Sequence, residues 1–427
     1  MSEIYLLIFN IGLYVAACAY FFRRNRHSFT TYASYIYLTN SVFSLLYYLT
    51  PVYNYSPAGL GGVVNLPAVV WLFVFNFLLC YTLRYFDIEE TYKLENYHSN
   101  YWKKIQIFLC LIYGLYVIYA LPGSIENLMS SDLSDIRNEY MSEGLDFKIP
   151  DFVQKFNVYF SGLYFIILLI PAIKRIVLHE KLSFWDYTSL IIYVLYEISK
   201  IGEAVSRSSI LHVICDLFLI IMFLRQFMQS GIIKRLALII IPILYMLFSM
   251  MGNITEQRFG EQTLESAYMQ QVSIYRYAGE SQLDFFSIMY DKTKGNTWGY
   301  RTFSSYRKVC GLDYYGKDKM QIVSQDDPFL NKTHPYDNHI FYGAGGNWYW
   351  DWGKYMPIIM MIILNILIDK NKADRTLNVY KLIIAHSIIG YVFFGIFFSS
   401  QISFHFLFFA FLLYLPLRNT KPITIKQ

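Results

Sequence analysis

Arginine side chains outside the apolar segments are the groups in this sequence best suited to chemistry on a phosphate. The polar stretch 253–340 contains four of them: Arg258, Arg276, Arg301 and Arg307. Arginine keeps its charge and grips phosphate oxygens through a bidentate fork. Arg258 follows an apolar segment closely, and Arg276 lies between Tyr275 and Tyr277. Taken alone, each also has a simpler interpretation as a solvated surface charge.

A second set of charges occurs at steps of three, three and four residues. It consists of Glu197, Lys200, Glu203 and Arg207. If one helix continued through all four, they would share a single face. Charges at membrane depth are expensive, so they face a cavity or each other. Two interpretations stay open: a self-paired ladder that closes a helical hairpin, or a site in which Arg207 projects into an external cavity and binds an anion.

The end of the polar stretch supplies groups that can accept a proton. They are His334, Asp337, Asn338 and His339, directly before an aromatic-glycine run at 341–353. A neutral histidine or a carboxylate can take the proton of a hydroxyl nucleophile; a local hydrogen-bonding role is the alternative. The histidines have no cysteine partners, so zinc is not expected. The glycines of the run lack the Gly-Lys-Ser/Thr of a phosphate-binding loop.

Composition places these residues in a membrane protein. Hydrophobic residues make up 55% of the 427 residues and charged residues 16%, whereas about a quarter of a soluble domain is charged. A span needs about 20 apolar residues. Eleven segments qualify: 4–22, 29–50, 65–84, 105–121, 153–173, 186–204, 208–228, 235–252, 341–368, 377–398 and 401–417. The first is expected to be a spanning helix rather than a cleaved signal.

Basic residues predict the orientation of these spans. They cluster after the first span, before the fourth, and at alternate ends from there to the C-terminus. Cytoplasmic loops collect lysine and arginine. We therefore expect the N-terminus outside, the C-terminus in the cytoplasm, and the loops 122–152 and 253–340 on the external side. Of the five cysteines, only Cys310 lies in the long loop, so no disulfide framework is expected there.

The long loop has a composition that can fold. It carries ten lysines and arginines against eleven acidic residues, together with many aromatic residues. Apolar positions at steps of three or four predict helix within 261–289. The expected fold is an all-α polytopic integral membrane protein with a partly helical external loop. Its predicted parts are spans 1–252, the loop 253–340, and the last spans with the tail, 341–427.

This layout resembles the Wzy-type O-antigen and capsular polysaccharide polymerases, which join oligosaccharide repeat units. The similarity covers most of the chain. Ser206-Arg207-Ser208-Ser209 resembles the family's small-residue-Arg segment, and Thr297-Trp298-Gly299 resembles a segment late in its large loop. The run from Asn347 to Gly353, with Asp351 between tryptophans, resembles the family's stretch at the start of the next span. Some members carry Arg, ten residues, then Gly in both external loops; here nine residues separate Arg301 from Gly311.

The resemblance implies a metal-independent glycosyltransferase of the GT-C type, without a cofactor. Its substrates would be repeat units on undecaprenyl diphosphate at the outer face of a bacterial inner membrane, and a chain-length regulator and a flippase would be possible partners. Arg207, Arg258 and Arg276 would stabilise the diphosphate leaving group, and His339, His334 or Asp337 would serve as base. The remaining implied substrate contacts are Lys200, Glu203, Tyr275, Tyr277, Trp298, Arg301, His334, Asn338, Asn347, Trp348 and Asp351.

Two other functions remain open. An O-antigen ligase would transfer the same glycan to lipid A core, and its large loop would also lie late in the chain. A transporter or lipid-oligosaccharide flippase is the alternative from another class. Flippases of this kind usually show paired internal repeats and broken helices at matching places, and this sequence shows no such symmetry.

Overall fold

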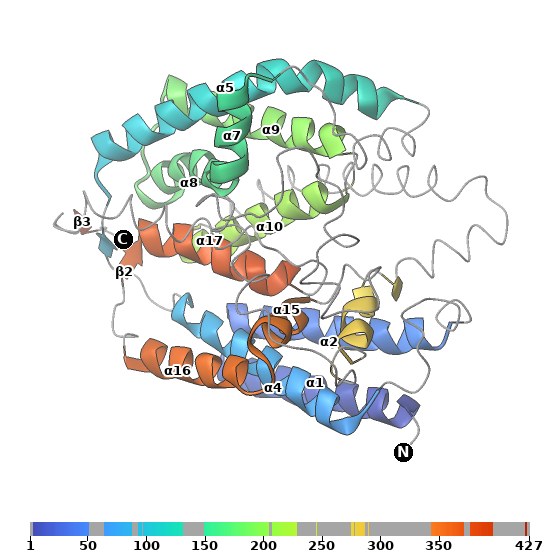
Figure 1. Cartoon of the computed structure of the whole chain (residues 1–427). Coiled ribbons are helices and arrows are strands. Elements are labelled where there is room, and N and C mark those ends of the chain that lie inside the picture. The colour runs from blue at the N-terminus through green and yellow to red at the C-terminus, as the bar shows by residue number, and fades with distance from the viewer. Residues whose placement is uncertain are drawn as a thin grey trace. The chain divides into compact units, whose positions relative to one another are not determined.

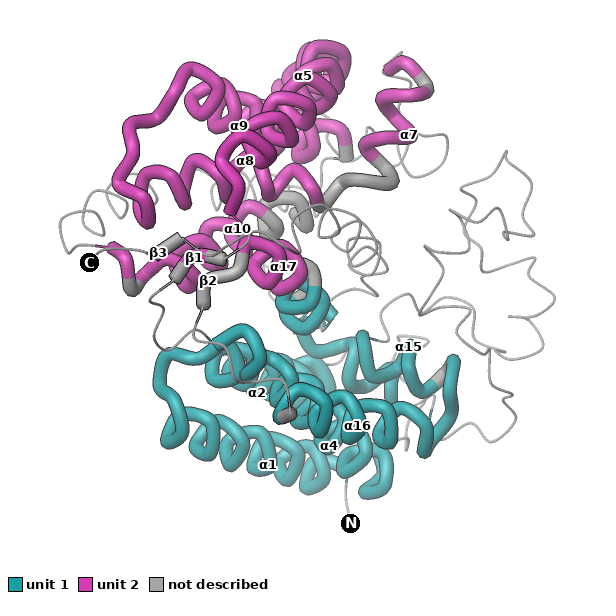
Figure 2. Tube along the Cα trace, turned by 90° about the vertical axis from the view of Figure 1, so that its left-hand side faces the viewer, with its two compact units in different colours: residues 1–87, 267–374, 387–404 teal, residues 88–266, 375–386, 405–427 magenta. Residues whose placement is uncertain are grey.

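The computed structural model describes most of the apolar segments and little of the long loop. The described residues are 3–50, 64–87, 93–95, 97–130, 149–204, 207–228, 245, 275–276, 278–286, 289, 343–370, 376–395 and 423–424. They form two compact units, each assembled from distant parts of the chain (Figure 2). Unit 1 comprises Met1–Asp87, Ala267–Asp374 and Ser387–Phe404. Unit 2 comprises Ile88–Ser266, Arg375–His386 and His405–Gln427.

Unit 1 is built from helices that lie side by side (Figure 1). They are α1 (Glu3–Arg24), α2 (Phe29–Tyr48), α4 (Leu66–Thr82) with the 3-10 turn η1 (Leu83–Tyr85), α15 (Gly343–Trp352), α16 (Met356–Lys370) and the second part of α17 (Val379–Phe394). Residues 278–286 add a helical segment. Two of the helices begin at side-chain caps: Ser28 accepts from the Thr31 amide and Asn65 from the Ala68 amide.

Unit 2 pairs the long helix α5 with α9 and adds shorter elements around them (Figure 1). These elements are β1 (Lys93–Glu95), α5 (Ser99–Met129), α7 (Asp151–Phe160), η2 (Ser161–Tyr164), α8 (Phe165–Ala172), a π-helical turn η3 (Ile173–Val177), α9 (Phe184–Ala204), α10 (Arg207–Leu224), η4 (Arg225–Phe227), β2 (Thr376–Asn378), the first part of α17 and β3 (Ile423–Thr424).

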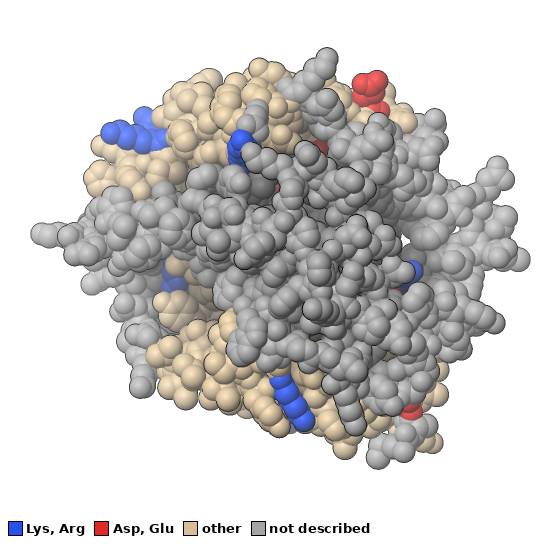
Figure 3. Space-filling view, viewed as in Figure 1, with Lys and Arg blue, Asp and Glu red and all other residues tan. Residues whose placement is uncertain are grey.

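Helix length and surface chemistry are those of a helical membrane protein. Within the described residues, three helices are long and apolar enough to cross a membrane: Glu3–Arg24, Leu66–Tyr85 and Ser99–Met129. Large apolar side chains on α1, α5 and α16 are exposed. Figure 3 shows few charges among the described residues that its view displays. The described helices cover the predicted segments apart from 235–252 and 401–417, which lie almost wholly outside the described residues. The total of eleven spans stays a prediction.

Three short strands bring together segments that the basic residues predict to lie on one side. β1 pairs in parallel with β2, Lys93 opposite Thr376, and antiparallel with β3, Lys93 opposite Thr424. β1 lies in the predicted cytoplasmic loop between the segments 65–84 and 105–121, β2 directly follows Arg375, and β3 lies in the C-terminal tail. Strands can pair only where their backbones meet, so the sheet supports a common side for these segments.

Two predicted segments differ from the helices observed. α5 continues to Met129, although the predicted segment ends at 121 and Pro122 follows. Its last turns are held by α9: Ser124 donates to the Ser199 carbonyl at 2.9 Å and Asn127 to the Gly202 carbonyl at 3.2 Å. The segment 341–368 is not one helix, because α15 ends at Trp352 and α16 begins at Met356. Gly353 lies between them at φ 72°, a conformation that favours glycine.

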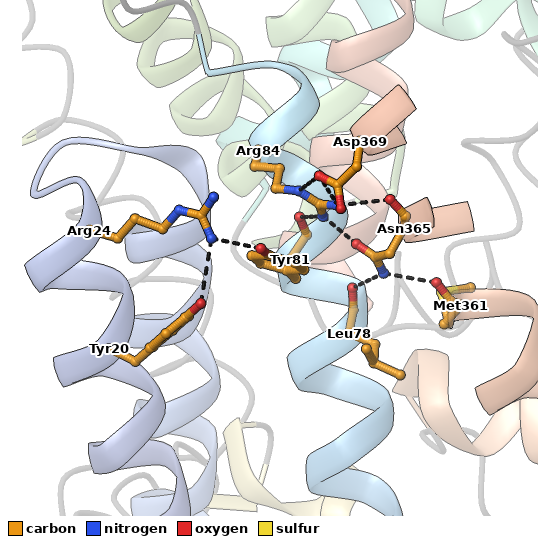
Figure 4. Close-up of polar contacts among 8 residues, drawn as sticks. All are labelled: Tyr20, Arg24, Leu78, Tyr81, Arg84, Met361, Asn365 and Asp369. Carbon is orange, nitrogen blue, oxygen red and sulfur yellow. Dashed lines mark hydrogen bonds and ion pairs between the residues drawn. The ribbon is translucent and has the colours of Figure 1, made fainter. Parts of the chain in front are cut away.

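One buried arginine ties α4 to α16 (Figure 4). Arg84 is 4% exposed, and its Nη2 lies 2.8 Å from an Asp369 carboxylate oxygen. The guanidinium also donates to the side chain and carbonyl of Asn365 and lies over the Tyr81 ring, 3.8 Å from its centroid. Arg24 of α1 donates to the Tyr81 hydroxyl at 2.6 Å. Arg84 of η1 therefore joins the end of α4 to α16, and the Tyr81 hydroxyl links α1 to the same cluster.

We expect Arg84→Ala to destabilise the folded protein by about 1–3 kcal/mol, the cost of leaving buried hydrogen-bonding groups without their partner. Thermal unfolding in detergent measures the effect. Arg23→Ala is the matched control, because Arg23 lies on an exposed position of the same bundle. Equal unfolding midpoints for the two variants would contradict the structural role of Arg84.

Candidate functional site

A helix from the predicted external loop is buried inside unit 1. Residues 278–286 are helical, and every side chain from 279 to 286 is buried, including four polar or charged ones. This agrees with the helix predicted within 261–289. A loop segment that packs among apolar helices must bring partners for its polar groups. The contacts around it therefore define what this part of the loop does.

Polar side chains of α1 and α2 anchor the loop helix. The Asn10 amide donates to Ser41 Oγ and to Gln282 Oε1, both at 2.8 Å. The Asn40 amide donates to the Ala278 carbonyl. Asn10 and Gln282 are 0% and 2% exposed, so their bond is shielded from water and its loss would be costly.

The loop helix approaches the backbone of α2 at a glycine. Ser44 of α2 donates to the Gly279 carbonyl at 2.7 Å. A Cβ atom added at Gly279 would collide with the backbone of Phe43 and Ser44. Backbone atoms cannot move aside as a flexible side chain can, so this close approach requires glycine. Phe43 also packs against Tyr275, with ring centroids 5.8 Å apart.

Arg276 of the loop is held by a buried carboxylate. Its Nε lies 2.9 and 3.1 Å from the two carboxylate oxygens of Glu280, one helical turn away. Arg276 is 47% exposed and Glu280 is 2% exposed. Burial raises the pKa of Glu280, and the Arg276 charge opposes that shift. Burial also raises the pKa of Asp284, with Glu280 contributing in the same direction.

Aromatic rings join the loop helix to α15. Phe285 stacks on Trp71 of α4, with centroids 5.1 Å apart. Tyr349 of α15 meets both rings edge-on, at 5.7 Å from Phe285 and 5.3 Å from Trp71. Trp71 donates to the Lys354 carbonyl at 2.6 Å, just beyond α15. The structure therefore brings Tyr275 and Arg276 of the loop into the same unit as the predicted aromatic-glycine run.

The predicted residues of α15 are buried within unit 1. Asn347, Trp348 and Asp351 are 7%, 6% and 0% exposed. Trp348 donates to the Tyr391 hydroxyl at 2.8 Å. Gly345 passes close to Leu72, whose Cδ1 would lie 2.7 Å from an added Cβ. In this arrangement α15 forms the wall against which the loop helix packs.

The charged set of unit 2 does not occupy one helix. α9 ends at Ala204 and α10 begins at Arg207, so Arg207 belongs to a different helix from its predicted companions. Lys200 and Glu203 form an ion pair at 2.9 Å, which agrees with the ladder interpretation for these two. Tyr116 of α5 donates to Glu203, and Lys200 lies over the Tyr116 ring. No local pattern in the sequence indicates Tyr116, because it lies 87 residues from Glu203.

The other predicted site residues lie outside the described residues, and the side chain of Arg207 is not described either. They are Arg258, Tyr277, Trp298, Arg301, His334, Asp337, Asn338 and His339. Their roles stay predictions. Among the residues that the structure describes, no three His, Cys, Asp or Glu side chains gather as a metal site requires.

No family model matches the chain, and neither a curated protein nor a solved structure is significantly similar to it.

We expect Gly279→Ala to displace the loop helix from α2, because the new methyl group collides with backbone. Gly12→Ala is the matched control, since nothing lies within 4 Å of a Cβ built there. The reporter is Ser281→Cys in a Cys310→Ser background, labelled with a membrane-impermeant maleimide. Labelling should rise strongly with Gly279→Ala and stay low with Gly12→Ala. Equal labelling in both backgrounds would show that the close approach does not hold the helix.

Proposed function

We propose that this chain is a GT-C-type glycosyltransferase that polymerises undecaprenyl-diphosphate-linked oligosaccharide repeat units into O-antigen or capsular polysaccharide. The observation that carries the proposal is the half-exposed Arg276, held by Glu280 on a loop helix that is anchored among membrane helices. The resemblance of the sequence to the Wzy-type polymerases supplies the reaction class. The guanidinium of Arg276 is suited to stabilise the lipid diphosphate that leaves in that reaction.

In the proposed reaction a hydroxyl oxygen of the acceptor repeat unit attacks the anomeric carbon of the donor chain. The bond from that carbon to the lipid diphosphate breaks, and the hydroxyl proton passes to a base or to water. Negative charge builds on the departing diphosphate. A guanidinium preorganised at that point lowers the barrier, by roughly 2.7–4 kcal/mol for one donor of this kind. A fixed arginine does this without a metal ion.

Glu280 is the residue that fixes the direction of Arg276 in this proposal. Its two oxygens receive the Arg276 Nε, which restricts rotation of the long side chain and reduces the entropy lost on binding a substrate. The Gln282–Asn10 and Gly279–Ser44 bonds in turn fix the helix. Tyr275 lies beside Arg276 and is suited to contact a sugar face.

The proposed orientation places this site at the external face of a bacterial inner membrane. Basic residues predict the N-terminus in the periplasm and the C-terminus in the cytoplasm. The pairing of β1, β2 and β3 supports a common side for the three segments predicted to be cytoplasmic. The loop that carries Arg276 then lies on the opposite side, where lipid-linked repeat units would be presented.

The test is incubation of the purified protein with undecaprenyl-diphosphate repeat units, followed by electrophoresis of the products. A ladder of lengthened lipid-linked chains is expected. Arg276→Ala should reduce its rate roughly 100-fold, in line with loss of one preorganised donor, and Arg276→Lys should be intermediate because it keeps the charge without the fork. Lys354→Ala, which removes an exposed charge of the same unit, is the control. An undiminished ladder from folded Arg276→Ala would contradict the proposal.

The same assay separates the alternatives. Transfer of glycan only to lipid A core, without a ladder, would identify a ligase. Movement of intact lipid-linked oligosaccharide across a vesicle membrane without new glycosidic bonds would identify a flippase or transporter.

Arg207, the first residue of α10, is proposed to stabilise the diphosphate leaving group, as the resemblance implies. In cells, Arg207→Ala should leave protein level and lipid-linked single repeats intact while long chains disappear. Immunoblotting and glycan electrophoresis measure the two quantities. Normal chain length in this variant would exclude the role, and loss of the folded protein would support the ladder interpretation instead.

A further inference from the structure

An aspartate and a histidine to which no role is assigned above meet inside unit 2. His386 Nε2 lies 2.6 Å from Asp216 Oδ1, and the two side chains are 14% and 2% exposed. Phe165 stacks on the imidazole, with ring centroids 4.1 Å apart. The three residues come from α17, α10 and α8. The contact therefore joins three helices that are far apart in the sequence.

Other titratable groups extend this contact into a network. The Tyr193 hydroxyl donates to Asp216 Oδ2 at 2.8 Å. Tyr164 of η2 lies close to both Asp216 and Glu197 of α9, and the two carboxyl groups interact electrostatically. Lys200 lies one turn beyond Glu197 and interacts with it. On α10, Cys215 is buried beside Asp216.

The network lies at the depth where ionisable groups are most expensive. Asp216 is eight residues into the predicted segment 208–228, and His386 is nine residues into 377–398. At about 1.5 Å per helical residue, both lie about 12–14 Å from the segment ends, near the middle of a core about 30 Å thick. Ionisable groups at such depth are rare, pair with each other, and mark substrate or ion pathways, proton relays or voltage sensors.

The chemistry of His386 and Asp216 favours a proton as the bound cation. A carboxylate that receives one imidazole nitrogen fixes the ring orientation and stabilises the ring when the second nitrogen gains a proton. The hydroxyl of Tyr193 bonds the other carboxylate oxygen, so Asp216 keeps a partner in either state of the ring. The few acidic and basic groups nearby offer no set of three metal ligands among the described residues. A proton is the cation that fits.

We propose that His386 and Asp216 form a buried proton-binding site in unit 2, in which the imidazole takes up an exchangeable proton and the carboxylate stabilises the resulting cation. The proton arrives at the ring nitrogen that does not face Asp216 and leaves from it, so no bond between heavy atoms changes. Uptake turns a hydrogen bond between α17 and α10 into an ion pair. Proton occupancy therefore sets the strength of this link between the two helices.

Histidine-selective ¹⁵N NMR of the purified protein in detergent tests the proposal without any activity measurement. Ring nitrogen shifts report whether each of the eight histidines carries one ring proton or two. On acidification of the folded protein, the His386 signal should convert from the singly to the doubly protonated form. In Asp216→Asn the conversion should require a pH lower by about one unit or more, because a carboxylate favours the charged ring and an amide does not.

Two variants assign the signal independently. His386→Gln removes the His386 signal, and Phe165→Leu shifts that signal because it removes the stacked ring. If one variant fails to fold, the other still assigns the signal. The signal of His27, an exposed histidine of unit 1, should be unchanged in Asp216→Asn. A His386 ring that keeps a single proton until the protein unfolds would overturn the proposal, and so would conversion at the same pH in wild type and Asp216→Asn. Either result would leave a purely structural hydrogen bond.

Discussion

Polar side chains inside apolar helices need partners from other helices, and this requirement determines how both units pack. In a membrane no water is available to satisfy a buried amide, carboxylate or guanidinium. Asn10 of α1 reaches α2 and the loop helix, and Asp186 of α9 receives Lys174 and Gln106 from other helices. Apolar surfaces can slide past one another, whereas these bonds permit one register. The loop helix keeps its place for the same reason.

The sequence predicts the elements of this fold well and their partners poorly. Apolar length and periodicity locate α1, α2, α4 and α9, and they indicate helix around 278–286, because these are properties of neighbouring residues. The break at Gly353 interrupts a run whose composition is apolar and aromatic throughout, so length alone predicts one helix across it. The extension of α5 beyond Pro122 depends on Ser199 and Gly202, about 75 residues away.

In the candidate site, too, the sequence indicates single residues but not their partners. Arg276 stands out by residue type, and the aromatic-glycine run by composition, but their common membership of unit 1 depends on Trp71 and Asn10, which look like ordinary residues of apolar helices. Asp216 and His386 are single polar residues in separate apolar segments, 170 positions apart. No spacing rule relates them. Pairings of this kind follow from tertiary packing, which the one-dimensional pattern does not contain.

Two arginines of unit 1 show how burial separates a structural cation from a candidate catalytic one. Arg84 is 4% exposed and its partner Asp369 is 58% exposed, so the cation is enclosed by protein and the carboxylate faces outward. Arg276 and Glu280 reverse the arrangement, at 47% and 2%. A buried carboxylate that holds an accessible guanidinium orients a positive charge toward whatever approaches from outside the helix bundle. An anionic leaving group needs the arrangement of Arg276 and Glu280. The arrangement of Arg84 and Asp369 instead stabilises helix packing.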